Sequence, residues 1–271
     1  MLKKLNDVNM YMDFINEINN DPDFYDPMLS TDEQIQCNLL NAPNKPDNHI
    51  FGVFDKEEII GLFVFLILKD ELYIEMLVGL SKRQQAYDEM LSYLKKEFKG
   101  YQADFVYSPN NYLLHKKLQD EKADFEVEQQ KMIHKKDVLH DSNYQVEVYS
   151  PEYKEQYIAI HSKDGYWTAE KVIDASDRFR IILAIENHEV VGYIDITYKY
   201  EENEPFDVFV KNEYRKKGYA KAMLAKAIEL NKPHDMMLLV DIDNVAAIAL
   251  YESLGFVKAV GQNNMTAHVM L

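Results

Sequence analysis

The most constraining feature of the sequence is an apolar run that leads through a basic loop into a helix. Residues 206–210 read Phe-Asp-Val-Phe-Val, and residues 219–230 have an alanine-rich helical pattern. A strand, loop and helix in this order point unpaired backbone N–H groups and the positive end of the helix dipole at one spot. Gly218 has no Cβ, so a ligand can approach the backbone there closely. The segment predicts a phosphate or pyrophosphate site.

A second motif follows one predicted strand later. Residues 236–243 are apolar and are followed by a helix that Asp243 or Asn244 can cap and that Gly255 can end. The sequence resembles the GNAT N-acetyltransferase superfamily through two motifs. The first is Arg215-x-x-Gly218-x-Ala220, and the second contains Asn244, Tyr251 and Gly255-Phe256.

The resemblance implies acetyl-CoA as the cosubstrate. The basic loop would hold its pyrophosphate, a backbone N–H at Phe209 or Val210 would polarise the thioester carbonyl, and Asn244 would face the pantetheine arm or act only as a helix cap. The implied cofactor-binding residues are Phe209, Val210, Arg215, Lys216, Lys217, Gly218, Tyr219, Ala220 and Asn244.

The candidate catalytic residues are one tyrosine and a few carboxylates. Tyr251 is protonated at neutral pH and could donate to the leaving thiolate, or it could simply pack against the sheet. Glu204 and Asp207, which flank the start of the apolar run, are the first candidates for the general base. Asp195 is another candidate, and each of these carboxylates could also be a solvated surface charge.

The acceptor is expected to be a cationic amine. A net charge of −16 disfavours nucleic acid and anionic membranes as partners and favours a cation. In the segment 161–168, Trp167 beside Asp164 could enclose a cation, or Trp167 could fill the core. The eight histidines have no metal-ligand spacing, so no metal site is expected.

The sequence also repeats itself once. Ile59-Ile60-Gly61 aligns with Val190-Val191-Gly192, each after an apolar strand and a tight turn, which predicts two β-hairpins. Residues 78–88 align with 210–220, and residues 111–125 echo 244–256. Alternating β and α elements predict an α/β fold with mixed sheets. The repeat therefore predicts two tandem GNAT-like domains, residues 1–140 and 141–271, which end in closing strands over 125–133 and 256–271.

The two copies differ where the cofactor would bind. Ala86 replaces Gly218, Asp88 replaces Ala220, and Leu118 replaces Tyr251. The Asp88 carboxylate would occupy the position of a phosphate with its own charge. We therefore expect the N-terminal domain to keep the fold and to have lost cofactor binding.

Bulk properties point to a folded cytoplasmic protein. The sequence has no run of 18 apolar residues and no N-terminal signal-peptide pattern. The single cysteine, Cys37, excludes an intrachain disulfide, and we expect it to be buried on a helix. A homodimer is compatible with this composition.

Three functions remain open. The first is an acetyl-CoA-dependent N-acetyltransferase that acts by direct attack of a primary amine of a small molecule or peptide. The second is a non-catalytic CoA-binding or interaction module. The third, an aminoacyl transferase using charged tRNA, follows from the tandem arrangement but conflicts with the net charge of −16.

Overall fold

The computed structural model describes residues 1–136, 144–163 and 167–271, which form two compact units. The first unit contains residues 1–130, 241–243 and 260–271, and the second contains residues 131–240 and 244–259. The chain therefore passes between the units four times. No helix among the described residues is both long enough and apolar enough to cross a membrane.

The first unit is built on a seven-stranded sheet in the order β1-β2-β3-β4-β5-β15-β6. Its neighbouring strands are antiparallel except β4 and β5, which are parallel. The strands are β1 (Leu2–Leu5), β2 (Asn48–Asp55), β3 (Glu58–Leu68), β4 (Tyr73–Leu80), β5 (Gln102–Tyr107), β6 (Asp124–Phe125) and β15 (Met265–Met270).

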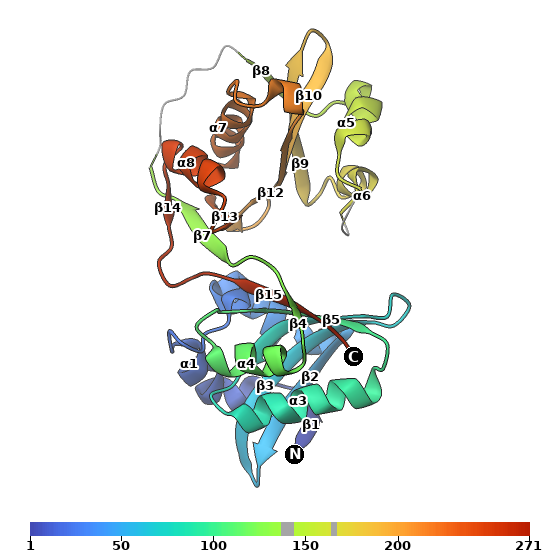
Figure 1. The fold of residues 1–271 in the computed structure, drawn as a ribbon, viewed down its shortest axis with the longest axis vertical. Coiled ribbons are helices and arrows are strands. Elements are labelled where there is room, and N and C mark those ends of the chain that lie inside the picture. Colours follow the sequence, from blue (N-terminus) through green and yellow to red (C-terminus); the bar gives the residue numbers. More distant parts are fainter. Residues whose placement is uncertain (137–143, 164–166) are drawn as a thin grey trace. The chain divides into compact units, whose positions relative to one another are not determined.

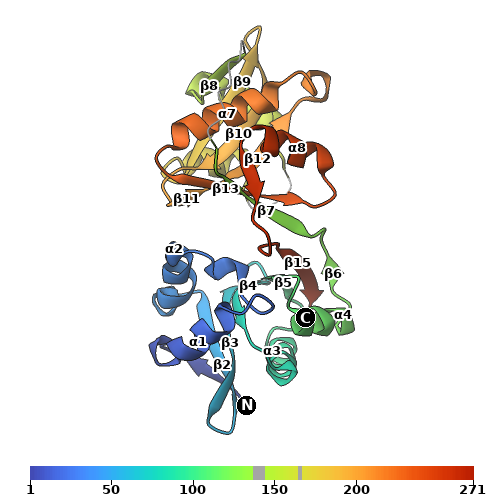
Figure 2. The same ribbon diagram turned by 90° about the vertical axis from the view of Figure 1, so that its left-hand side faces the viewer.

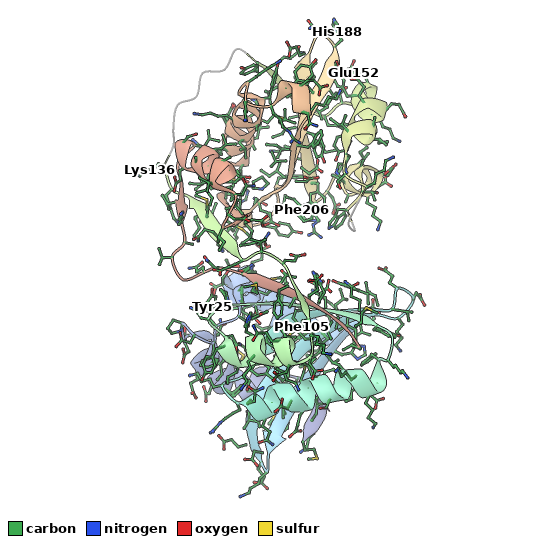
Figure 3. All side chains as sticks on the ribbon, in the orientation of Figure 1. Tyr25, Phe105, Lys136, Glu152, His188 and Phe206 are labelled. Atoms are coloured by element: carbon green, nitrogen blue, oxygen red, sulfur yellow. The ribbon has the colours of Figure 1, made fainter. Side chains whose placement is uncertain are left out.

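Helices cover both faces of this sheet. Successive residues of a strand point to opposite faces, so Phe63 and Phe105 enter the core beneath α3 and α4, whereas Leu62 enters the core beneath α1. Figure 3 shows Phe105 inside this unit. The helices are η1 (Asn9–Tyr11), α1 (Met12–Asn19), η2 (Pro27–Leu29), α2 (Asp32–Gln34), the π-helix η3 (Ile35–Leu40), η4 (Ala42–Asn44), α3 (Gln84–Glu97) and α4 (Tyr112–Asp120).

The second unit contains two separate four-stranded sheets. One has the order β12-β10-β9-β8, formed by β8 (Gln145–Val148), β9 (Phe179–Glu186), β10 (Glu189–Thr197) and β12 (Pro205–Val210). The other has the order β11-β13-β7-β14, formed by β7 (Gln129–His134), β11 (Glu202–Asn203), β13 (Asp235–Asp241) and β14 (Phe256–Lys258). Consequently β12 ends its sheet and is not hydrogen-bonded to β13.

Helices also cover both faces of the β12-β10-β9-β8 sheet. The helix α7 lies on one face, and α5 and α6 lie on the other (Figure 1). The helices of this unit are η5 (Pro151–Tyr153), α5 (Lys154–Ile160), α6 (Ala169–Asp174), η6 (Asn212–Tyr214), α7 (Tyr219–Asn231) and α8 (Val245–Ser253).

Both predicted hairpins are present. The hairpin β2–β3 turns at Lys56 and Glu57, and β9–β10 turns at Asn187 and His188, which lies at the tip of its hairpin (Figure 3). Asn187 and His188 have φ values of 52° and 66°, as a two-residue type I′ turn requires.

The closing strands differ from the sequence prediction. The segment 125–133 is divided between β6 in the first unit and β7 in the second-unit sheet β11-β13-β7-β14, and the segment 256–271 is divided between β14 and β15. The C-terminal strand β15 lies between β5 and β6 of the first unit (Figure 2). The compact units are therefore not the contiguous segments 1–140 and 141–271, because sequence periodicity identifies a strand but not its partner.

Cys37 also differs from expectation. It is exposed, and it lies in the π-helix Ile35–Leu40. That segment buries Leu39 instead.

A buried carboxylate holds the start of η2 against the first sheet. Asp26 accepts hydrogen bonds from the backbone N–H of Gly79 at 2.6 Å and of Met28 at 2.8 Å, and η2 packs against both β4 and β5. Burial raises the pKa of Asp26 to about 7.

Because β15 belongs to the sheet of the first unit, a substitution in this C-terminal strand should destabilise that unit. Val269 is 3% exposed in the first core and Met270 is 68% exposed. Val269→Asp buries an unpaired charge, so we expect a loss of about 3 kcal/mol in the free energy of unfolding. Hydrogen exchange should show lost protection in β4 and β5 while β9 and β10 stay protected. Met270→Asp is the matched control, and lost protection confined to β9 and β10 would contradict the assignment.

Asp26 predicts a pH dependence of stability. Its folded pKa lies above the unfolded value, so the folded chain holds more protons between about pH 4 and pH 7. The contribution, at most about 4 kcal/mol, is fully present below pH 4 and is lost as the pH rises through 7. Urea unfolding from pH 5 to pH 8 should show this loss in the wild type and not in Asp26→Asn. The exposed neighbour variant Asp23→Asn should behave like wild type, and equal slopes for Asp26→Asn and wild type would refute the assignment.

Candidate functional site

The basic loop forms a left-handed turn directly before α7. Lys216 has φ 60° and Gly218 has φ +104°, and Gly218 is the N-cap of the helix. A side chain is strained at this φ, which explains why glycine is required. The N–H groups of the first turn of α7 have no intrahelical acceptors. This geometry suits a phosphate at the helix N-terminus.

The side chains around the loop combine positive charge with aromatic rings. Arg215 Nε donates to the Val210 carbonyl at 2.9 Å, and Lys217 Nζ lies 5.1 Å from the centre of the Tyr214 ring. Tyr144 donates its hydroxyl to the Lys217 carbonyl, and its ring covers Gly218 on the side that a Cβ would take. Tyr219 donates its hydroxyl to Glu186, which holds the first helical residue in place. Lys216 and Ala220 complete the loop and the first turn of the helix.

The end of β12 presents one backbone donor to its unpaired edge. The Lys211 N–H donates to the Val191 carbonyl at 2.9 Å, and Val210 is paired in register with Gly192. Hydrogen-bonded pairs alternate in antiparallel strands, so the Phe209 N–H points toward β10 and the Val210 N–H points away from it. The Arg215 contact confirms this direction for the Val210 carbonyl, which lies on the same side of the strand as its N–H. Of the two predicted donors, Val210 is therefore the one directed to the open edge.

The second motif lies on and before α8. Asn244 is the N-cap, and its side chain accepts from the Ala247 N–H at 3.1 Å. Tyr251 is half-buried, with its ring 5.9 Å from that of Phe256, and burial raises its pKa. Its hydroxyl therefore keeps its proton at neutral pH, as a proton donor requires.

The face of β10 and β12 under α5 carries a cluster of ionisable side chains. His161 Nε2 lies 2.9 Å from Asp195 Oδ2 and 4.0 Å from Asp207 Oδ2. Tyr157 donates to Asp195 Oδ1 at 2.8 Å, and Tyr193 donates to Asp207 Oδ2 at 2.7 Å. The side chains of His161 and Asp195 are 2% and 0% exposed, whereas that of Asp207 is 33% exposed. Asp207 is thus the carboxylate of this cluster that a ligand can reach.

Electrostatics within the cluster follow from burial and hydrogen bonding. Burial lowers the pKa of His161, but hydrogen bonds to Asp195 and Ser162 outweigh it, so the pKa is raised overall. Burial raises the pKa of Asp195, against the opposing hydrogen bonds from His161 and Tyr157. Burial raises the pKa values of Tyr157 and Tyr193, and the neighbouring carboxylates raise them further. Both hydroxyls therefore stay protonated and can donate hydrogen bonds.

The three predicted carboxylates have different surroundings. Asp207 is accessible within the cluster, and both oxygens of Asp195 are engaged in buried hydrogen bonds. Glu204 lies outside the cluster, where burial raises its pKa and the charges of Arg178 and Lys131 oppose that shift. His161, Asp195 and Asp207 also offer three ligand atoms within 4.8 Å of one another, a grouping that the spacing of the histidines did not indicate.

The segment expected to recognise the acceptor is described in part. Asp164 lies outside the described residues. Trp167 packs edge-on against Phe179 at 4.8 Å, and Arg178 lies 4.8 Å from the Trp167 ring. These contacts support the alternative in which Trp167 fills the core beneath α6.

The equivalent loop in the first unit has a different conformation. The helix α3 begins at Gln84, and the Ala86 N–H donates to the Arg83 carbonyl at 3.1 Å, so the segment aligned with the Gly218 turn is already helical. Ala86 is buried, and a Cβ added to Gly61 would lie 2.6 Å from the Ala86 Cβ. Asp88 is paired with Lys117 at 3.3 Å.

Sequence reasoning missed His161, Tyr157 and Tyr193. Their spacing carried a signal, because Tyr157 and His161, the C-cap of α5, are four residues apart, and Tyr193 and Asp195 are two residues apart on one strand face. Which helix face packs over which strand was not available from this spacing.

Part of the chain matches a known protein family. Residues 145–256 match the family model described as acetyltransferase (GNAT) family. No curated protein matches the sequence.

Solved structures share the fold over the whole chain. A GCN5-related N-acetyltransferase from Sphaerobacter thermophilus is 11% identical, with a TM-score of 0.71 over 99% of this chain and 94% of that one. A GNAT-family acetyltransferase from Colwellia psychrerythraea is 12% identical, with a TM-score of 0.58 over 100% of both chains. A tandem GNAT protein from the clavulanic acid biosynthesis pathway is 10% identical, with a TM-score of 0.57 over 99% of this chain and 98% of that one.

The family match covers the segment with the left-handed Gly218 turn, and the structural matches cover both halves. Residues 145–256 therefore match the GNAT acetyltransferase family, and the fold of the chain is that of solved GNAT structures, a tandem GNAT protein among them.

Proposed function

We propose that this protein is an acetyl-CoA-dependent N-acetyltransferase that acetylates a primary amine of a small molecule or peptide by direct attack. The observation that carries the proposal is the Gly218 turn before α7 beside the unpaired edge of β12. The turn fits a pyrophosphate, because it offers helix N-terminal N–H groups and the charges of Arg215, Lys216 and Lys217. The other proposed cofactor contacts are Phe209, Val210, Tyr219, Ala220 and Asn244.

Each step has a candidate residue. Acetyl-CoA, when bound, supplies the acyl group as a thioester. The Val210 N–H would donate to the developing oxyanion, a term that is often worth about 3 kcal/mol. Asp207 would accept the proton of the amine, and Tyr251 would donate one to the departing sulfur. Glu204 remains the second candidate base.

The acidic composition supports a cationic acceptor rather than nucleic acid. The net charge of −16 attracts cations, and Asp207 places a half-open carboxylate on the face of β12 opposite α7. We further propose that the first unit binds no CoA, because the segment aligned with the Gly218 turn is helical at Ala86. Asp88 does not take the position of a phosphate as the sequence predicted, because it is the fifth residue of α3 and pairs with Lys117.

Gly218→Glu tests the donor site. The substitution adds negative charge and strain at φ +104°, so we expect acetyl-CoA to bind at least roughly 100-fold more weakly, or about 2.7 kcal/mol. Calorimetric titration should give one site per chain in the wild type and none in the variant. Lys226→Glu, on the same helix but away from the loop, should bind like wild type. Two wild-type sites would show that the first unit also binds the cofactor, and no binding would remove the proposed function.

Tyr251→Phe separates catalysis from binding alone. Loss of the proton donor should lower kcat roughly 100-fold and leave the Kd for acetyl-CoA unchanged. Steady-state assays with an acetylated amine, together with the same titration, measure both quantities. An unchanged kcat would refute the role of Tyr251, and a wild type that binds acetyl-CoA but acetylates no amine would favour the non-catalytic module.

A further inference from the structure

The cluster beneath α5 contains a buried histidine with acceptors on both ring nitrogens. His161 Nδ1 lies 2.8 Å from the Ser162 carbonyl, and Nε2 lies 2.9 Å from Asp195 Oδ2. A carbonyl oxygen can only accept, so Nδ1 must carry a proton. If Asp195 is ionised, Nε2 must carry one as well, and the ring is an imidazolium.

The tyrosines complete the hydrogen bonding of the same network. Tyr157 donates to Asp195 Oδ1, so both Asp195 oxygens take part in hydrogen bonds. Tyr193 donates to Asp207 Oδ2 and accepts from the Ser162 N–H at 3.3 Å, with its ring stacked 4.9 Å from that of His161. Among the described residues, no hydrogen bond to Asp207 Oδ1 is formed. That oxygen is therefore the acceptor left for a ligand.

A charged His161 would balance the charge of one of the two neighbouring carboxylates, Asp195 and Asp207. The Asp195 and Asp207 oxygens lie within 4.8 Å of each other, and two carboxylates this close repel, so without a cation one of them would normally hold a proton. A cation between them allows both to ionise. With His161 charged, the pair His161–Asp195 is neutral, and Asp207 alone carries the net negative charge of the cluster.

We propose that His161 is a positioning residue of the acceptor site, which neutralises Asp195 so that Asp207 stays ionised and binds and deprotonates the ammonium group of the amine. This inference rests on the proposed function. Because the cluster presents one net negative charge through one open oxygen, the substrate class is a primary amine that arrives as a single ammonium group at Asp207.

The proton balance of the reaction follows. The ammonium gives one proton to Asp207 Oδ1, and the neutral nitrogen forms a bond to the thioester carbon. The carbon–sulfur bond then breaks and the sulfur gains a proton from Tyr251, while the second nitrogen proton passes through water to Tyr251 and restores its hydroxyl. The products are the amide, the free thiol and one proton released from Asp207 to water. His161 keeps its protons throughout.

Two variants test whether His161 acts by neutralising Asp195 or by transferring protons itself. His161→Gln removes the cation and leaves Asp195 and Asp207 to compete for one proton. We expect kcat/KM for the amine to fall roughly 100-fold while KM for acetyl-CoA stays unchanged. The double variant His161→Gln/Asp195→Asn removes both charges of the pair and leaves Asp207 alone again. It should regain at least about tenfold of the lost activity. Glu155→Gln, an exposed charge change on α5, is the control.

The outcomes are distinct. A double variant as inactive as His161→Gln would overturn the proposal, because it would mean that His161 itself moves protons. An unchanged His161→Gln would overturn it as well. Loss of wild-type activity on chelation, restored by Zn²⁺ or Mn²⁺, would replace it with a metal site made of the same three side chains.

A spectroscopic measurement makes the proposal independent of turnover. The ¹⁵N spectrum of the histidine side chains at pH 7.5, assigned by the signal lost in His161→Gln, should show both ring nitrogens of His161 protonated in the intact chain. A neutral ring would refute the charge assignment. The acceptor for the assays is the best substrate from a screen of primary monoamines, diamines and amino acid amides. If no amine in the screen is acetylated, the proposed function fails, while the spectrum still decides the state of His161.

Discussion

The unpaired edge of β12 is the constraint on which the candidate site depends. Because β12 ends its sheet, the alternation of antiparallel hydrogen bonds leaves the Val210 N–H and carbonyl facing outward. Arg215 Nε donates a hydrogen bond to the Val210 carbonyl, which fixes the basic loop to the end of the strand. The left-handed Gly218 turn then starts α7 where that loop ends. If β13 were paired to this edge, the Val210 N–H would donate to a carbonyl of β13 and would not be open to a ligand.

The two faces of the β12-β10-β9-β8 sheet differ in chemistry. The face under α7 carries the apolar core that supports the loop and includes Val210 and Met223. The opposite face, under α5 and α6, carries Tyr193, Asp195 and Asp207, where a network of hydrogen bonds replaces part of the apolar packing. Buried polar groups of this kind need partners, and the hydrogen bond between His161 and Asp195 supplies one for each as well as the basis of the proposed charge balance.

In the first unit, the segment equivalent to the Gly218 turn has a different conformation. The helix α3 begins at Gln84, and the Ala86 N–H donates to the Arg83 carbonyl within its first turn. Asp26 also occupies the Gly79 N–H near the end of β4. At both positions a backbone N–H donates to an acceptor within the protein, and Ala86 packs closely against Gly61.

The sequence by itself determined the fold family, the two hairpins and the Gly218 turn, because turn chemistry, caps and strand periodicity are local properties that a few neighbouring residues specify. It offered Asp243 or Asn244 as the N-cap of the last helix, and the structure has Asn244 there. Only the tertiary structure decided that β7 and β15 are exchanged between the units, and that His161 meets Asp195 and Asp207. Strand partners and helix–sheet contacts join residues far apart in the chain, and their choice depends on burial and packing of the whole unit rather than on any local pattern.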